Sequence, residues 1–260
     1  ILPTHDRRHV LARTVASYRA LAARMPVIVI DDASNDGSAA WLRAQGLTVV
    51  RSPRRLYLPG ARNLGLHLAR TPWVLFGEDD VVFAPGHVDR LLAYARRLPR
   101  CAAIGGRLHA VDAWDLPAAE PAPTAGPLLD PRLHLGDFAA AGTTPRPVPS
   151  LHAVSLVDRS AALACGGYDT AFSGSGAFRE ESEFYARLWH AGHACWWTPS
   201  TWCIHVRHRL GGGARGRRGL LGKLGNRWCY IADNARYENR HAALWQRLAG
   251  GASPGRQKAA

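Results

Sequence analysis

The order of apolar and amphipathic stretches constrains the fold of this chain more than any other feature. Residues 27–30 read Val-Ile-Val-Ile and residues 74–76 read Val-Leu-Phe, with no polar residue inside either run. Such runs are typical of strands that are buried on both faces of a sheet. Apolar residues at helical spacing occupy residues 9–25, 38–44 and 61–69. This alternation predicts an α/β domain with right-handed crossovers and a mostly parallel central sheet flanked by helices.

A proline-rich stretch separates this region from the rest of the chain. Residues 112–150 hold 8 of the 17 prolines and show neither a helical nor a strand period. We therefore expect a long irregular connection, which in a compact domain is usually functional. Regular structure is predicted around it in five segments: strands at 153–157 and 195–197, and helices at 180–191, 220–232 and 242–249.

The positive charge of the chain is concentrated near its end. The net charge is +13, and only two of the 33 basic residues are lysines. Residues 1–204 hold 21 basic and 18 acidic residues, whereas residues 205–260 hold 12 and 2. The excess indicates an anionic partner, although a GC-rich genome, which favours arginine codons, explains it equally well. Confinement of the charge to the last fifth, without a helix-turn-helix or zinc pattern, argues against a nucleic-acid binder.

The lengths of the apolar runs and the distribution of the cysteines further restrict the class of protein to which the chain can belong. No apolar run approaches the roughly 20 residues that a membrane-spanning helix needs. The five cysteines are scattered and form no C-x-x-C pair. This pattern predicts a reducing compartment, the cytoplasm, and no disulfide framework.

Two acidic groups come directly after the apolar runs. Asp-Asp at residues 31–32 follows the first run, and Glu-Asp-Asp at residues 78–80 follows the second. Ligands of open α/β sheets bind beyond the carboxyl ends of the strands. Two acidic groups there would repel each other unless a cation lay between them, and a hard divalent ion that also binds phosphates fits that position. For residues 31–32, turn formation and helix capping are an equally good explanation.

A third acidic group, at residues 180–183, opens a predicted helix after the glycine-rich residues 173–176. Carboxylates are favourable at helix N-termini, but the loop before them suggests a carboxylate exposed in a substrate cleft. His205 follows a strand-like Trp-Cys-Ile run. On its own, such a histidine is more often a satisfied polar residue than a ligand.

Taken in order, six motifs resemble those of family 2 glycosyltransferases of the GT-A fold, which is Rossmann-like. They are residues 2–7, 29–38, 60–65, 75–82, 166–172 and 180–188. Two positions depart from the family pattern. Glu78 stands first in the metal-binding D-x-D motif, and glutamate replaces the commoner aspartate at the position of the general base, which leaves Glu180 and Glu181 as alternatives.

The resemblance implies roles on the donor side. Thr4 and Asp32 would hold the nucleotide base, and Arg62 would help to position the nucleotide. Glu78 and Asp79 would lie beside the ribose and the sugar.

The resemblance also implies a metal site and a general base. Asp80 and His205 would ligate Mn2+ or Mg2+ on the diphosphate. Glu181, or alternatively Glu180, would take the proton from the acceptor hydroxyl as that oxygen attacks the anomeric carbon.

The implied activity is inverting transfer of a sugar from a nucleoside-diphosphate sugar to a sugar, lipid-linked or small-molecule acceptor, as in bacterial cell-wall, polysaccharide or glycoconjugate synthesis. Residues 1–110 would form the nucleotide-sugar-binding half and residues 111–204 the acceptor-binding half. Residues 205–260 would form a basic, helical C-terminal segment. The arginines at residues 207–218 would close over the donor diphosphate, or would hold the protein peripherally against an anionic membrane. The alternative is a catalytically inactive GT-A-like module that binds a sugar nucleotide or acts as a scaffold.

Overall fold

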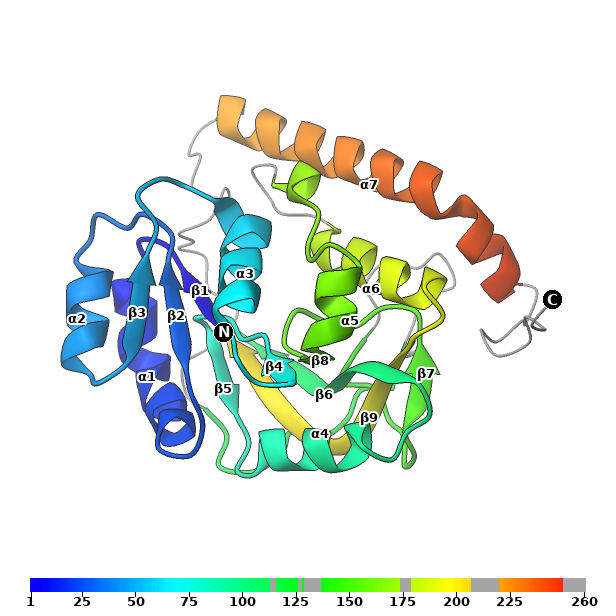
Figure 1. Ribbon diagram of the computed structural model, residues 1–260, viewed down its shortest axis with the longest axis horizontal. Coiled ribbons are helices and arrows are strands. Elements are labelled where there is room, and N and C mark those ends of the chain that lie inside the picture. Colours follow the sequence, from blue (N-terminus) through cyan, green and yellow to red (C-terminus); the bar gives the residue numbers. More distant parts are fainter. Residues whose placement is uncertain (113–115, 126–127, 129–136, 174–178, 207–219, 250–260) are drawn as a thin grey trace.

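The computed structural model describes residues 1–112, 116–125, 128, 137–173, 179–206 and 220–249 (Figure 1). Within the last of these ranges, side chains are described for residues 228–243.

The first part of the chain forms a parallel sheet with strand order β1-β2-β3. Its strands alternate with helices, as the apolar pattern predicts. The elements are β1 (Leu2–Thr4), α1 (Arg8–Ala22), β2 (Ile28–Asp31), α2 (Ser38–Ala44), β3 (Thr48–Arg51) and α3 (Tyr57–Leu68). The apolar run at residues 27–30 is therefore the central strand, with Val29 and Ile30 fully buried.

A second sheet has the strand order β4-β8-β6-β9-β5, with β7 paired to β9. Its strands are β4 (Trp73–Leu75), β5 (Val81–Phe83), β6 (Cys101–Val111), β7 (Arg146–Val148), β8 (Leu156–Asp158) and β9 (Ala194–Val206). The pair β6–β9 is parallel and the other pairs are antiparallel. The expected α/β architecture, with sheet strands between helices, is confirmed (Figure 1).

The two sheets join at the first residue. The Ile1 amine donates to the Leu75 carbonyl (2.7 Å), and the Gly77 N–H donates to the Ile1 carbonyl (2.9 Å). This is a parallel bridge, so β1 runs in the same direction as the end of β4. The carboxyl ends of β1, β2 and β4 consequently open on one edge, where both acidic groups of the first part lie.

The helices of the second part are α4 (His87–Ala95), α5 (Arg159–Ala164), the short 3-10 helix η1 (Thr170–Phe172), α6 (Glu180–His190) and α7 (Leu220–Ala249). Phe76, Tyr168 and Phe184 pack in one apolar cluster that joins β4 to α6, with the rings of Tyr168 and Phe184 stacked 4.4 Å apart. This cluster forms the floor beneath the candidate site.

Several predicted boundaries were wrong. The strand expected at 153–157 is shorter, since β8 spans only Leu156–Asp158. The strand expected at 195–197 extends to Val206, which brings His205 to its end. The helices expected at 220–232 and 242–249 are one continuous helix, α7. The residues between the two expected segments supply the described side chains of α7 that are buried against the rest of the protein. Asn234, Tyr237 and His241 are buried and lie at helical spacing. The face of α7 that packs against the protein therefore shows no period of aliphatic residues in the sequence.

The 112–150 connection is irregular in its described residues apart from β7 and a single bridge between Thr124 and Ala140. None of the helices in the described part of the chain is long and apolar enough to cross a membrane.

Candidate active site

Two acidic groups from distant parts of the sequence meet at one buried arginine. Arg62, in α3, is 0% exposed. Its Nη2 lies 3.3 Å from Glu78 Oε1, and its Nη1 lies 3.4 Å from Glu181 Oε1 and 3.6 Å from Glu180 Oε1. The Tyr168 ring lies 5.0 Å from its guanidinium carbon. The loop after β4 and the start of α6 are thus joined through a single cation.

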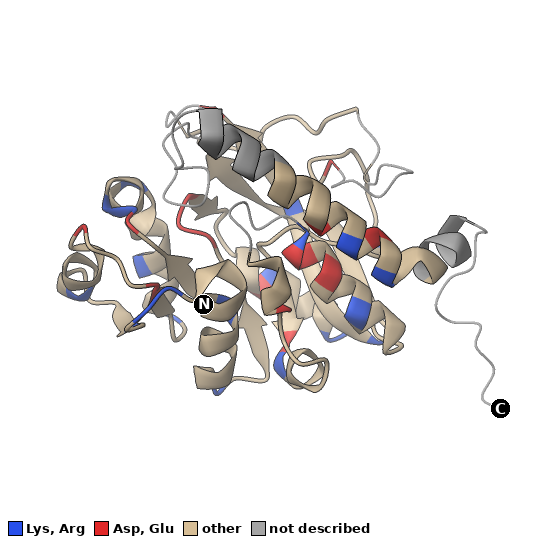
Figure 2. Cartoon of the chain, turned by 90° about the horizontal axis from the view of Figure 1, so that it is seen from above, with Lys and Arg blue, Asp and Glu red and all other residues tan. Residues whose placement is uncertain are grey.

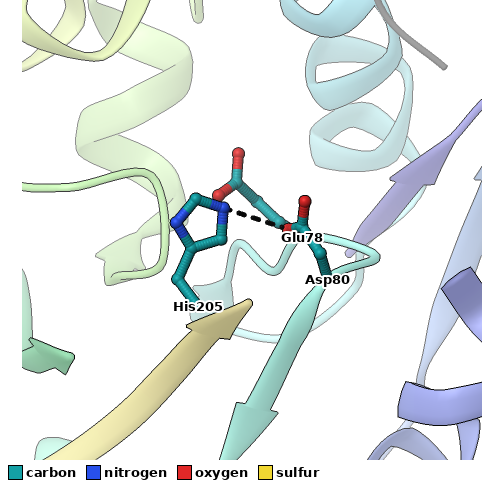
Figure 3. A group of neighbouring side chains, drawn as sticks. All are labelled: Glu78, Asp80 and His205. Atoms are coloured by element: carbon teal, nitrogen blue, oxygen red, sulfur yellow. Dashed lines mark ion pairs between the residues drawn. The ribbon is translucent and has the colours of Figure 1, made fainter. Parts of the chain in front are cut away.

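Glu78, Asp80 and His205 lie close enough to share one ion (Figure 3). Each offers one ligand atom, and these atoms lie within 4.8 Å of one another. His205 faces the start of β5 because Val81 is its partner in the β5–β9 pair. His205 Nε2 lies 3.4 Å from Asp80 Oδ1. The structure therefore brings together the two predicted metal ligands and adds Glu78, which the resemblance places beside the ribose.

The electrostatics of this trio suit a cation. Burial raises the pKa of Glu78, and the charge of Asp80 raises it further. Burial lowers the pKa of His205, but its hydrogen bond with Asp80 and the nearby carboxylates raise that pKa overall. Two carboxylates and an imidazole are a donor set that Mn2+ accepts readily, whereas Mg2+ prefers oxygen alone. The residues present fit a divalent ion.

Asp79 points into a different network. It accepts a hydrogen bond from Thr4 Oγ1 (2.7 Å) and pairs with Arg7 Nε (2.9 Å). Arg7 Nη2 also bonds Asp80 Oδ2 at 2.6 Å. Burial raises the pKa of Asp79 to about 7, with Arg7 opposing the shift and Asp80 adding to it. Arg7 was missed in the sequence, although its place directly after the first strand and turn puts it at the same edge.

Hydrogen bonds from α1 fix the backbone of the 78–80 loop. Thr14 Oγ1 donates to the Asp79 carbonyl (2.7 Å), and Tyr18 OH donates to the Glu78 carbonyl (2.5 Å). These bonds hold the loop where Glu78 and Asp80 point toward His205.

Thr4 and Asp32 lie side by side, since the Asp32 N–H donates to the Thr4 carbonyl at 2.8 Å. Asp32 Oδ1 accepts from the Leu56 N–H (2.6 Å), and Oδ2 lies 3.3 Å from Arg55 Nη1. Asp32 thus helps to fix the residue that precedes α3. Its contact with a nucleotide base stays a prediction.

Glu180 and Glu181 differ in their surroundings. The Glu180 side chain is 2% exposed and the Glu181 side chain 14%. Burial raises the pKa of Glu180 well above its usual range, and the charge of Glu181 adds to the shift. Glu180 is therefore held toward its protonated form, and Glu181 is the carboxylate that a substrate reaches more easily.

Not every predicted feature lies in the part of the chain that the structure describes. The arginine-rich stretch at 207–218 and most of the loop at 173–178 fall outside it. Arg62 is described, and its guanidinium is covered by acids and by Tyr168. A direct contact of Arg62 with a nucleotide stays a prediction.

Comparison with known proteins identifies relatives. The model of the family described as glycosyl transferase family 2 matches residues 1–134. N-acetylglucosaminyl-diphospho-decaprenol L-rhamnosyltransferase of Mycobacterium tuberculosis is 28% identical over 273 residues, which cover 91% of this chain and 82% of that protein.

Solved glycosyltransferase structures share the fold. GalNAc-T7 with UDP, GalNAc and Mn2+ superposes with a TM-score of 0.63 at 19% identity over 81% of this chain, which spans only 44% of that one. The mannosyltransferase PcManGT from Pyrobaculum calidifontis, in complex with GDP-Man and Mn2+, gives 0.57 at 18% identity over 97% of this chain and 75% of that one. TarS of S. aureus with UDP-GlcNAc gives 0.59 at 13% identity, covering 84% of this chain and 60% of that one.

Proposed function

Because the chain belongs to glycosyl transferase family 2 and is a glycosyltransferase of the GT-A fold, we propose that it moves a sugar from a nucleoside-diphosphate sugar to an acceptor hydroxyl with inversion, using Mn2+ or Mg2+. The observation that carries the proposal is the meeting of two acidic groups at Arg62, with Glu78, Asp80 and His205 on one side and Glu181 on the other.

The donor would lie along the edge formed by β1, β2 and β4. Thr4 and Asp32 stand at the ends of β1 and β2 and would hold the base, while Asp79 holds Thr4 in place. Glu78, Asp80 and His205 would hold the ion. An ion bound there would neutralise the charge that develops on the leaving diphosphate.

Glu181 would act as the general base. In an inverting transfer, the acceptor oxygen attacks the anomeric carbon while the bond to the diphosphate breaks on the opposite face. Glu181 takes the proton of that hydroxyl. Arg62 Nη1 lies 3.4 Å from Glu181 Oε1 and helps to hold this carboxylate in place. Glu180 is less suited, because its burial favours the protonated form.

The acceptor is proposed to be lipid-linked. This rests on the mycobacterial relative, whose name gives a diphospho-decaprenol acceptor. Trp228, Tyr230 and Ile231 of α7 are exposed large hydrophobic side chains, Trp228 at 70%. Together with the net positive charge of residues 205–260, they support peripheral contact with an anionic membrane where such an acceptor would lie.

An inactive sugar-nucleotide-binding or scaffold module is the weaker alternative. The acids at residues 78–80 and 180–181 are all present together with His205, and a protein that has lost activity usually loses at least one such group. The presence of all these groups favours the enzyme.

A thermal-shift screen of UDP-, GDP- and dTDP-sugars, with and without Mn2+, tests the proposal. We expect one nucleotide class to raise the melting temperature, and to do so more strongly with Mn2+, because a ligand that binds only the folded state stabilises it. If no donor stabilises the protein under either condition, the enzyme proposal fails and the inactive module is favoured.

A further inference from the structure

Helix α7 contacts the residue just before the Glu180–Glu181 pair. Arg179 precedes the first turn of α6, and its Nε donates to Asn234 Oδ1 of α7 at 2.7 Å. Its guanidinium carbon also lies 5.0 Å from the centre of the Tyr237 ring. Both partners come from α7, more than 50 residues further along the chain.

Arg179 adopts a backbone conformation that a residue with a side chain seldom takes. Its φ is +68°, in the left-handed region. Its carbonyl accepts from the Glu183 N–H (2.8 Å) and so closes the first turn of α6. The direction in which α6 starts therefore depends on Arg179, and Arg179 is held by α7.

Helix α7 also contacts Glu183, which lies two positions after the pair. Glu183 is fully buried, and its Oε1 lies 2.8 Å from Arg240 Nη1. The same Nη1 bonds Asp169 Oδ2 at 2.6 Å. Arg187, one turn along α6, bonds Glu183 as well. In Figure 2 basic residues of α7 lie beside acidic residues of α6, in agreement with the Arg240–Glu183 pair.

We propose that Asn234 and Arg240 are positioning residues for the transfer reaction: by holding Arg179 and Glu183, they fix the first turn of α6 and so set where the Glu181 carboxylate lies. The inference rests on the proposed function, in which Glu181 is the general base. A base displaced by about 1 Å from its productive position loses on the order of 100-fold in rate. Among the described residues, the side-chain partners of Asn234 and Arg240 lie outside Glu78, Asp80 and His205, so we expect donor affinity to change far less than turnover.

If α7 has a purely structural role, the expected effect of these substitutions is different. Tyr237 packs with Phe172, Ala186 and Trp189 in a small apolar cluster. If α7 only covered this cluster, loss of one polar contact would lower the melting temperature and leave turnover by the folded enzyme unchanged. The two roles are separated by comparing kcat with donor affinity.

The first test is the series Asn234→Ala and Asn234→Asp, with Arg236→Ala as the matched control. Arg236 lies on the same helix and bonds the Ala171 carbonyl of η1 (2.7 Å), not α6. We expect Asn234→Ala to lower kcat about tenfold or more with an unchanged donor Kd. Asn234→Asp keeps the oxygen that accepts from Arg179 and restores most of kcat, and Arg236→Ala stays near wild type. Wild-type kcat in Asn234→Ala, or an equal loss in Asn234→Asp, overturns the proposal.

The second test applies the same logic to Arg240. Arg240→Lys retains a cation that reaches Glu183, and Arg240→Gln does not. We expect Arg240→Gln to lower kcat at unchanged donor Kd and Arg240→Lys to recover part of the loss. A parallel fall of donor affinity in Arg240→Gln would show a general disturbance of the fold and would overturn the assignment.

Amide hydrogen exchange over residues 179–184 keeps this inference distinguishable from the proposed function. We expect faster exchange there in Asn234→Ala than in wild type or in Arg236→Ala, whether or not any sugar is transferred. If Glu181→Gln keeps full turnover while this exchange pattern holds, Glu181 is not the general base although α7 does fix α6. If no donor sugar is bound or transferred while the exchange pattern holds, the proposed function fails and the positioning of α6 stands. If exchange is unchanged in Asn234→Ala, the positioning role fails whatever the reaction is.

Discussion

At the scale of single residues, Arg62 determines how much negative charge the site can hold. It is fully buried and lies within 3.6 Å of three glutamates, Glu78, Glu180 and Glu181. Each of these carboxylates would be costly to bury alone. One cation therefore allows Glu78, a proposed metal ligand, and Glu181, the proposed general base, to lie close together.

Replacement of Arg62 is predicted to destabilise the protein severely. Arg62→Met leaves these acids without their shared cation and is expected to lower the free energy of unfolding by about 3–5 kcal/mol. Urea denaturation measures the loss. Arg55→Met is the control, because Arg55 is partly exposed where it pairs with Asp32, and such pairs contribute about 1 kcal/mol or less. Equal effects of the two substitutions would contradict the role given to Arg62.

Removal of Asp80 is predicted to abolish donor binding that depends on the metal. Asp80 is in reach of both His205 and Arg7, so Asp80→Ala removes a proposed metal ligand and leaves Arg7 paired with Asp79. Calorimetric titration with the nucleoside diphosphate that stabilises the wild type, with and without Mn2+, measures the effect. An Mn2+-dependent gain in affinity that survives in Asp80→Ala would rule out Asp80 as a ligand.

Sequence reasoning identified much of this site because its acids directly follow buried strands, where open α/β sheets bind ligands. The family resemblance, not the strand pattern, paired Asp80 with His205, and in the structure Glu78 lies beside them. Arg7 and the three-way contact of Arg62 were missed. No local pattern reveals such contacts, because they depend on how a helix and two loops pack against each other.

At the scale of elements, the strands were easier to predict than the last helix. Apolar runs without polar residues identify β2 and β4 directly, and the period of apolar residues identifies α1 to α3. The length of β9 was not predictable from its Trp-Cys-Ile run, since its pairing with β6 extends it. Helix α7 was read as two helices, because its contact face consists of Asn234, Tyr237 and His241 rather than aliphatic residues.

Two histidines buried beside β6 and β9 predict how stability varies with pH. Burial lowers the pKa of His152 to about 4 and that of His87 to about 3. The unfolded chain then binds more protons than the folded one as pH falls below the ordinary histidine value of about 6.5. Each histidine is expected to cost about 2 kcal/mol of stability at pH 5 relative to pH 7 or above.

Denaturation at pH 7 and pH 5 checks this expectation with His152→Gln. The glutamine cannot be protonated, so the variant should lose less stability on acidification than wild type. His9→Gln, at an exposed position of α1, is the control and should behave like wild type. An unchanged pH dependence in His152→Gln would show that His152 is not buried in its neutral form.

At the scale of the whole molecule, the surplus positive charge and the three most exposed large hydrophobic side chains of the described residues lie in the C-terminal part of the chain. The body of the enzyme is close to neutral, and residues 205–260 carry the surplus. Trp228, Tyr230 and Ile231 follow the arginine-rich stretch and are exposed. Sequence composition located the charge but did not choose between a diphosphate and a membrane as its partner.

Neutralising Arg215, Arg217 and Arg218 to glutamine distinguishes these two partners. We expect weaker binding to vesicles of anionic lipid, since each basic residue near such a surface contributes about 1 kcal/mol. Affinity for nucleoside diphosphate in solution should remain unchanged. Vesicle sedimentation and calorimetry on the same triple variant give both values. Intact vesicle binding with a loss of diphosphate affinity would assign the arginines to the donor instead.

The central claim is that Glu181 accepts the proton of the acceptor hydroxyl. The most direct test measures both the turnover and the donor affinity of Glu181→Gln. We predict a fall in kcat on the order of 100-fold or more, with donor Kd unchanged. Glu180→Gln, matched in chemistry and one position away, should lose far less, because burial already holds Glu180 toward its protonated form. Near-normal turnover in Glu181→Gln would contradict the account.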